Sequence, residues 1–164
     1  AEKAKLIEKG ERKQSWNLCE IHMSSIKENL KLLQKKGYAY KVVGMAWMQG
    51  ESDTNKEITA TSYQKNLENL ITGYRKLVSF KEMPFVIGQV NVLPRKYKIG
   101  PSQVRNAMQN IANSDSYVGI VKTKLDKNWK DFPKHSDNLH YNTSGQMKLG
   151  IGFGEILMKL RKSL

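Results

Sequence analysis

Residues 41–47 have the sequence KVVGMAW, and the polar block MQGESD follows directly at residues 48–53. The apolar positions of this run are nearly continuous instead of alternating with polar ones. That pattern is typical of a parallel strand covered on both faces. Two further runs share it, PFVIGQV at residues 84–90 and YVGIVKT at residues 117–123. The sequence therefore predicts three strands of a buried parallel sheet.

Segments with helical spacing lie before, between and after these strands. We predict helices at residues 18–36, 62–78, 101–112 and 144–160. The second has the strongest pattern, because its apolar side chains fall on one stripe. Gly37 suits the position just after the first helix, where a left-handed backbone conformation is common.

Two details are predicted for the last helix. Thr143 and Gln146 have the spacing of a capping box, in which the two side chains satisfy backbone groups of the first turn. Gly150 and Gly154 lie four residues apart, which would let this helix approach the sheet closely.

The order of elements is helix, strand, helix, strand, helix, strand, long loop and helix. Such alternation predicts right-handed βαβ units and an α/β three-layer sandwich with a central parallel sheet. Three strands make a narrow sheet, since domains of this class usually centre on about five. We therefore expect residues 1–164 to be the C-terminal part of a single domain, completed by strands outside this chain.

The composition is that of a globular domain. The chain of 164 residues is 39% hydrophobic and 26% charged, which is ordinary for a folded domain. No apolar run approaches the roughly 18 residues of a transmembrane helix, so we expect no membrane partner. The first 14 residues are charged throughout and do not have the pattern of a signal peptide. The single cysteine, Cys19, excludes a disulfide within the chain, and we interpret it as a small packed residue.

The net charge is +13, from 28 Lys and Arg against 15 Asp and Glu. The basic residues are scattered, with some density at residues 95–98 and 122–134. No zinc knuckle, helix-turn-helix or RNA-binding signature accompanies them. We favour a solvated basic surface and expect no nucleic-acid partner. A nucleic-acid-binding α/β domain is the alternative, and it depends on charge alone.

A first candidate site follows the strand at residues 41–47. Ligands of open α/β sheets bind beyond the carboxyl ends of the strands, where Gln49, Gly50 and Glu51 lie. Gln49 offers an amide donor, Gly50 permits a tight backbone path and Glu51 offers a carboxylate. An ordinary polar turn explains the block equally well. Ser52 is not expected to be a nucleophile, because no Gly-x-Ser-x-Gly elbow surrounds it.

A second candidate site is Asp137 with His140, near the end of the long loop at residues 124–142. Asp and His three residues apart suit a general base whose other ring nitrogen is oriented by a carboxylate. By itself this pattern is weak, and a surface histidine is the simpler alternative. His22 and His135 lack such a context. No cluster of Cys and His has zinc-ligand spacing, so no metal is expected.

Together the two blocks are more specific. GMAWMQGESD at residues 44–53 and DNLHYNTSGQMKLG at residues 137–150 resemble the sialate O-acetylesterase-like and acetylxylan esterase-like branch of the SGNH hydrolases. That family has a Trp-His-Gln-Gly-Glu-Ser-Asp block after its third strand. It also has an Asp-x-x-His-Phe/Tyr block before its last helix, which continues Gly-Gln-x-x-x-Gly. The similarity covers roughly residues 18–160.

The chain departs from the family pattern in two places. Met48 replaces the family's usual histidine, which affects no proposed catalytic group. The family's opening Gly-Gln-Ser-Asn block, which supplies the nucleophilic serine, has no counterpart in this chain. The strands that the narrow sheet lacks are the ones this block would occupy.

The resemblance implies an SGNH, flavodoxin-like fold and a carbohydrate O-acetylesterase that requires no cofactor. His140 would be the general base, with either Asp137 or Glu51 orienting it. Gln49 and Gly50 would hold the oxyanion or the substrate.

The implied partners are an acetylated carbohydrate and the missing N-terminal part of the same domain. A secreted or periplasmic location would suit a glycan esterase, although the sequence shows no signal. The alternative reading is a non-catalytic glycan-binding relative that lacks the serine.

Overall fold

The computed structural model describes residues 18–126 and 128–162, and its contacts separate residues 1–40 from residues 41–164 as two units. The N-terminal segment that the sequence analysis excludes as a signal peptide lies outside the described residues. Each unit is described by itself below.

The first unit contains one described helix, α2 (Leu18–Lys35), at the position predicted. It ends as expected at Gly37, whose φ of 75° lies in the left-handed region. The Gly37 amide donates a hydrogen bond to the carbonyl of Gln34, and the Tyr38 amide donates to that of Leu33. These bonds satisfy carbonyl groups of the last helical turn. Cys19 is half-buried in this helix.

The second unit is built on a parallel sheet of β1 (Met45–Trp47), β2 (Phe85–Gly88) and β3 (Val118–Val121). The strands lie in the order β1-β2-β3, with β2 in the centre. All three predicted strands exist, but each is shorter than its apolar run. The paired region starts where Met45, Phe85 and Val118 lie side by side, and the carbonyls of Pro84 and Tyr117 just before it accept hydrogen bonds from the amides of Met45 and Phe85.

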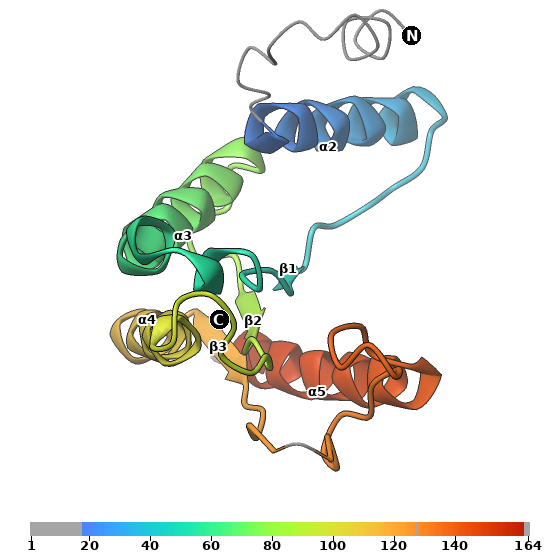
Figure 1. Ribbon diagram of the computed structural model, residues 1–164. Helices are drawn as coiled ribbons and strands as arrows, with labels where there is room; N and C mark the ends of the chain where they lie inside the picture. The colour runs from blue at the N-terminus through green and yellow to red at the C-terminus, as the bar shows by residue number, and fades with distance from the viewer. Residues whose placement is uncertain (1–17, 127, 163–164) are drawn as a thin grey trace, which may run out of the picture. The chain divides into compact units, whose positions relative to one another are not determined.

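Helices cover both faces of this sheet, as Figure 1 shows. The helices α3 (Glu57–Leu77) and α4 (Gly100–Ser114) pack against each other on one face. The helix α5 (Thr143–Lys162) packs on the other face, against β2 and β3. A short 3-10 helix, η1 (Asp53–Asn55), connects β1 to α3. The predicted three-layer α/β fold is confirmed.

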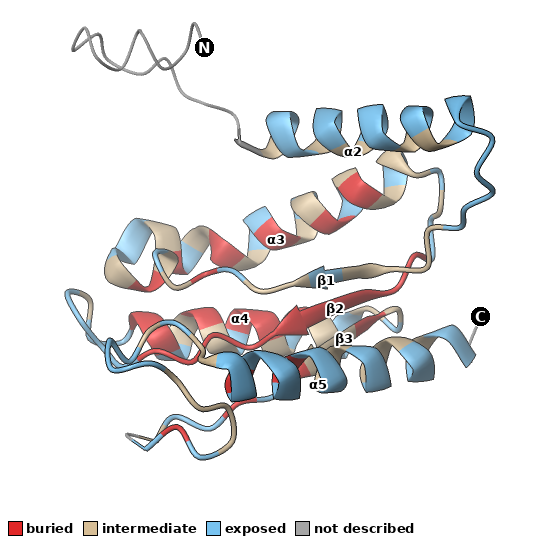
Figure 2. Cartoon of the chain, turned by 90° about the vertical axis from the view of Figure 1, so that its right-hand side faces the viewer, coloured by how far each residue is buried: buried red, intermediate tan, exposed pale blue. Residues whose placement is uncertain are grey.

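The central strand forms the core. All four residues of β2 are buried, and in Figure 2 the strand is buried along its whole length. Phe85 packs near Trp47 and Tyr74 on one face, whereas Val86 belongs to a cluster with Val121 and Leu149 under α5. The nearly continuous apolar run of this strand is thus explained by burial on both faces.

The predicted cap of the last helix is wrong by one residue. Asn142, not Thr143, caps α5, because its side-chain oxygen accepts a 3.0 Å hydrogen bond from the Gly145 amide. The Gln146 side chain donates to the carbonyl of Tyr141 instead of closing a capping box. Both asparagine and threonine suit a cap, so spacing alone could not choose between them.

The predicted role of Gly150 and Gly154 is also wrong. Both are exposed, and a methyl group at either would have no heavy atom within 4 Å. Gly152 faces the sheet instead, where a methyl group would lie 3.1 Å from a methyl carbon of Val121. The phase of the helix is set by Leu149, which is buried in the core cluster under α5.

Another glycine, Gly100 of α4, allows a test of the packing between α4 and η1. A methyl group at Gly100 would overlap the backbone carbonyl of Thr54. We expect Gly100→Ala to lower the free energy of unfolding by about 2 kcal/mol, because backbone cannot move aside cheaply. Gly154→Ala is the control, and we expect it to raise that free energy by roughly 0.5–1 kcal/mol, since the site is open and alanine favours a helix. Urea titrations measure both, and a fully stable Gly100→Ala protein would contradict the close approach.

Candidate active site

The backbone after β1 is held in place by Tyr63 of α3. The Tyr63 hydroxyl donates a 2.8 Å hydrogen bond to the carbonyl of Gln49. Gly50 is buried with φ 137°, and a methyl group there would lie 2.9 Å from the Tyr63 hydroxyl and 3.0 Å from Val90. Burial raises the pKa of Tyr63, so the phenol stays neutral and keeps its proton to donate. Glycine is therefore required at position 50, as the tight turn predicted.

The acidic part of this block continues into η1. The carbonyl of Glu51 accepts a 2.7 Å hydrogen bond from the Thr54 hydroxyl. The Glu51 side chain is half-buried, whereas Gln49 and Ser52 are exposed. Burial raises the pKa of Asp53, and the nearby Glu51 carboxylate acts in the same direction. Ser52 has ordinary helical angles of φ −70° and ψ −32°, so it does not lie on a strained elbow.

The second block lies on a small hairpin formed by residues 133–142, here called the His140 hairpin. Lys134 and Tyr141 form an antiparallel bridge across it. The His135 amide donates a 2.9 Å hydrogen bond to the carbonyl of His140, and the Asn142 amide donates a 3.1 Å bond to that of Pro133. This hairpin holds the end of the long loop directly before α5.

Asp137 and His140 are in direct contact. Oδ2 of Asp137 lies 2.6 Å from Nδ1 of His140. Oδ1 of Asp137 accepts hydrogen bonds from the backbone amides of Leu139, at 2.9 Å, and His140, at 3.0 Å. The Leu139 amide and the His140 imidazole hold the pKa of the Asp137 carboxyl well below its usual range. The pairing engages Nδ1 and leaves Nε2 to exchange a proton with a reacting group.

The pair is open to solvent. The side chain of His140 is 74% exposed and that of Asp137 is 47% exposed. The contact that the spacing predicted is therefore present, on the surface of the hairpin.

Lys134 joins the His140 hairpin to the segment that follows β2. Its ammonium donates to the backbone carbonyl of Asn91 and lies 3.9 Å from the centroid of the Trp129 ring. Burial lowers the pKa of Lys134 to about 8, and the carboxylates of Glu51 and Asp137 act in the opposite direction. The acid that contacts His140 is Asp137, not Glu51.

Buried polar groups lie beneath the hairpin. The Asn91 side chain is 1% exposed and lies beside the Tyr141 hydroxyl. Burial raises the pKa of Tyr141, the Glu51 carboxylate adds to this effect, and the Asn91 side chain acts in the opposite direction.

Sequence reasoning did not identify Lys134, Asn91 or Tyr141. Nothing distinguishes Lys134 from the other basic residues until the loop folds back over β2. Tyr141 directly follows His140 in the sequence, and this adjacency could have identified Tyr141 as a site residue.

Three further features bear on other kinds of site. Within residues 18–126 and 128–162, no group of three or more His, Cys, Asp or Glu side chains could hold a metal ion. No described helix is long and apolar enough to cross a membrane. A groove of about 860 Å³ lies at the opposite, amino ends of β2 and β3. It is lined by Thr72, Arg75, Lys76, Ser79, Phe80, Lys81, Glu82, Ser114, Asp115, Ser116 and Tyr117, and so contains none of the predicted site residues.

Comparison with known families places the chain in one of them. The family model of carbohydrate esterases described as sialic acid-specific acetylesterase matches residues 8–159. The chain therefore belongs to this family of carbohydrate esterases.

Individual relatives are distant. The probable carbohydrate esterase At4g34215 of Arabidopsis thaliana is 26% identical over 118 residues, which cover 70% of this chain and 40% of that protein. The X-ray structure of the Arabidopsis thaliana protein AT4G34215 matches with a TM-score of 0.67 and 25% identity, over 92% of this chain and 56% of that one. The chain thus spans about half the length of these relatives.

A second kind of match is partial. The DNA mismatch repair protein MutS of Prochlorococcus marinus strain MIT 9301 is 29% identical over 110 residues. The match covers 62% of this chain but 12% of MutS. It concerns a short segment of that protein and not its activity as a whole.

The environment of Lys134 gives a pH dependence with a defined sign. Its pKa of about 8 lies below the ordinary 10.5, so above pH 8 the unfolded chain binds more protons than the folded one. The free energy of unfolding therefore gains a contribution that rises with pH from about 8. Urea titrations measure the free energy of unfolding of the wild type and of Lys134→Met. We expect the wild-type value minus the variant value to increase between about pH 8 and 9.5, a range below the ionisation of ordinary tyrosines. Lys122→Met controls for the loss of one charge, and a flat difference would contradict the burial of the ammonium.

Proposed function

We propose that this chain carries the histidine and acid half of a carbohydrate O-acetylesterase, a serine hydrolase that removes acetyl groups from a glycan. The observation that carries the proposal is the 2.6 Å contact between Asp137 and His140. It occurs after β3, in a chain of a carbohydrate esterase family. The proposed partner is an acetylated carbohydrate, and the basic surface would suit an acidic one.

His140 acts twice in the proposed reaction. Its Nε2 takes the proton of a serine hydroxyl as the oxygen attacks the acetyl carbonyl, and it then gives that proton to the leaving sugar oxygen. Water afterwards hydrolyses the acetyl-serine ester by the same route and releases acetate. Asp137 holds the Nδ1–H and stabilises the imidazolium, a role that its contact with His140 supports over Glu51.

The first block would stabilise the oxyanion. Gln49 is exposed after β1, so its side-chain amide is free to donate to the developing negative charge. The Tyr63 hydrogen bond fixes the backbone at Gln49 and Gly50 before any substrate arrives. One such donor is worth about 3 kcal/mol of transition-state stabilisation. No metal or organic cofactor is part of this proposal.

The serine is proposed to come from an N-terminal part of the same domain, outside this chain. Two exposed features support a missing neighbour. The edge strand β1 has an exposed residue, Ala46, at its centre. The outer face of α5 exposes Met147, Ile151 and Met158. A further strand and helix packed there would widen the sheet and cover this apolar face.

The absence of the Gly-Gln-Ser-Asn block favours one alternative, a glycan-binding relative without catalysis. The coding sequence upstream of Ala1 separates the two readings. A Gly-Gln-Ser block there supports the enzyme, whereas a start codon directly before this chain supports the binding protein.

A first test uses this chain alone with p-nitrophenyl acetate. We expect no hydrolysis above that of an equal concentration of free imidazole, because the nucleophile is absent. Turnover that a single Ser→Ala substitution abolishes would overturn the proposal that the serine lies outside this chain.

A second test uses the protein extended by its upstream segment. His140→Gln should lower kcat/KM by about 10³–10⁴, and Asp137→Asn should lower it far more than Glu51→Gln. His135→Gln on the same hairpin is the matched control and should retain activity. Equal activity of His140→Gln and His135→Gln would exclude the proposed base.

A further inference from the structure

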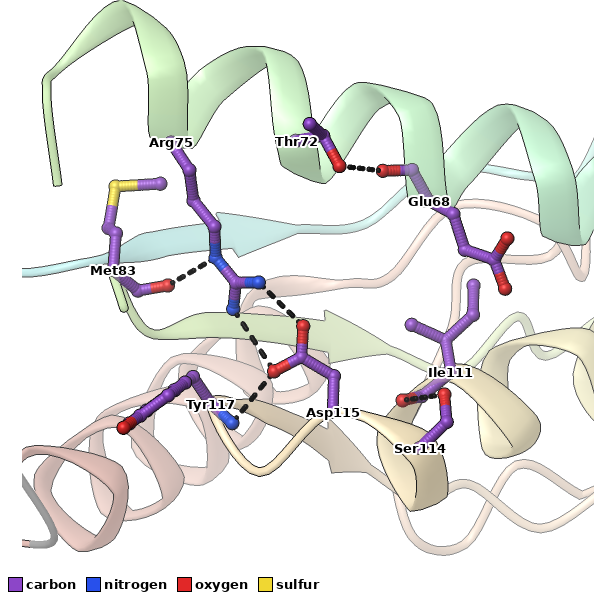
Figure 3. Close-up of polar contacts among 8 residues, drawn as sticks. All are labelled: Glu68, Thr72, Arg75, Met83, Ile111, Ser114, Asp115 and Tyr117. Atoms are coloured by element: carbon purple, nitrogen blue, oxygen red, sulfur yellow. Dashed lines mark hydrogen bonds and ion pairs between the residues drawn. The ribbon is translucent and has the colours of Figure 1, made fainter. Parts of the chain in front are cut away.

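Two half-buried arginines hold opposite ends of the same pair of strands. Arg75 of α3 lies at the amino ends of β2 and β3, as Figure 3 shows. Its Nε donates to the carbonyl of Met83 at 3.1 Å, and its two terminal nitrogens bind Asp115 at 2.5 and 3.3 Å. Asp115 in turn accepts the Tyr117 amide at 2.9 Å. This end of the sheet lies beside the groove and away from the candidate site.

Arg105 of α4 lies at the carboxyl ends. Its Nη1 donates to the carbonyl of Val90 at 2.6 Å and to the hydroxyl of Thr123 at 2.8 Å. Its Nη2 donates to the carbonyl of Thr123 at 2.6 Å. Thr123 is also bound to Gln89, through its amide at 3.3 Å and its hydroxyl at 3.2 Å. The guanidinium thus joins the two strands just beyond the last ladder positions.

The surroundings of Arg105 extend to the loop that carries His140. Thr123 directly precedes this loop, and Asp131, within it, accepts the Lys124 amide at 2.6 Å. Burial lowers the pKa of Arg105, while Tyr141 and Asp131 act on it in the opposite direction. Tyr141 is the residue next to His140. Arg105 therefore binds the start of the loop, and Asp131 ties the next residue, Lys124, to the middle of that loop.

We propose that Arg105 is a positioning residue of the esterase site, which holds the loop from Thr123 to Tyr141 so that the Asp137–His140 pair keeps its orientation. It reaches neither substrate nor His140 directly. The hydrogen bonds of Arg105 support its structural role. Its effect on catalysis rests on the proposed function.

A planar guanidinium is required for this role. Its donors form a rigid fork that can bind two carbonyls and a hydroxyl at once, whereas a lysine ammonium on a flexible stem cannot reproduce that geometry. Removing the fork would also leave buried carbonyl oxygens without a donor. The loop would then lose the fixed point from which it starts.

The test compares Arg105→Lys with Arg75→Lys, the matched control at the other end of the same strands. In this chain, NMR measures the tautomer of the His140 imidazole, assigned with His140→Gln, and hydrogen exchange of the His135 and Asn142 amides. We expect Arg105→Lys to raise both exchange rates about tenfold and to reduce the Nδ1–H tautomer. Arg75→Lys should lower the free energy of unfolding while leaving the two exchange rates and the tautomer population at wild-type values.

Two outcomes would overturn the inference. One is an Arg105→Lys protein whose hairpin exchanges as slowly as wild type with an unchanged tautomer. The other is an equal loosening in both variants, which would show a general effect of stability. If Arg105→Lys does not fold, Thr123→Val, which keeps the shape and removes the hydroxyl, should give a smaller change of the same kind.

Failure of the proposed function remains distinguishable from failure of this inference. In the protein extended by its upstream segment, Arg105→Lys should lower kcat about tenfold or more with little change in KM, because it disturbs the base and not the binding of the glycan. A protein without esterase activity in which only Arg105→Lys loosens the hairpin would reject the enzyme and retain the positioning role.

Discussion

The parallel register of three strands is the constraint on which the rest of the structure depends. Because Met45, Phe85 and Val118 lie side by side, the strands also end within one residue of one another, at Trp47, Gly88 and Val121. The polar residues that directly follow each strand therefore start from the same edge of the sheet. Backbone groups beyond the last ladder position still need partners, and Tyr63 and Arg105 supply them from the covering helices. These two side chains hold the segments from which the candidate-site residues follow.

Much of the fold could be predicted from the sequence, because it depends on burial. The continuous apolar run at residues 84–90 indicated a strand covered on both faces, and β2 is that strand. The ends of elements were less predictable. Strand ends depend on where a neighbour stops, and the cap of α5 depended on a choice between adjacent residues, Asn142 and Thr143. Gly150 and Gly154 were misplaced because spacing alone does not fix the phase of a helix.

The candidate site was predictable to the extent that it is local. Asp137 and His140 are three residues apart, so one hairpin suffices to bring them into contact. Lys134, Asn91 and Arg105 come from distant segments and meet through tertiary packing, which leaves no periodic signal in the sequence. Whether Glu51 or Asp137 binds the imidazole was undecidable for the same reason, and the geometry of the hairpin favours Asp137.

The Asp137–His140 pair is open to solvent, and this exposure affects its chemistry. Water surrounds His140 and competes for every proton and charge that the imidazole handles. Electrostatic forces gain strength when a neighbouring surface excludes that water and lowers the local dielectric. A lid of protein or bound sugar over the pair would therefore do more than deliver a reactant. In the proposed enzyme it would also strengthen the attraction between Asp137 and an imidazolium at His140.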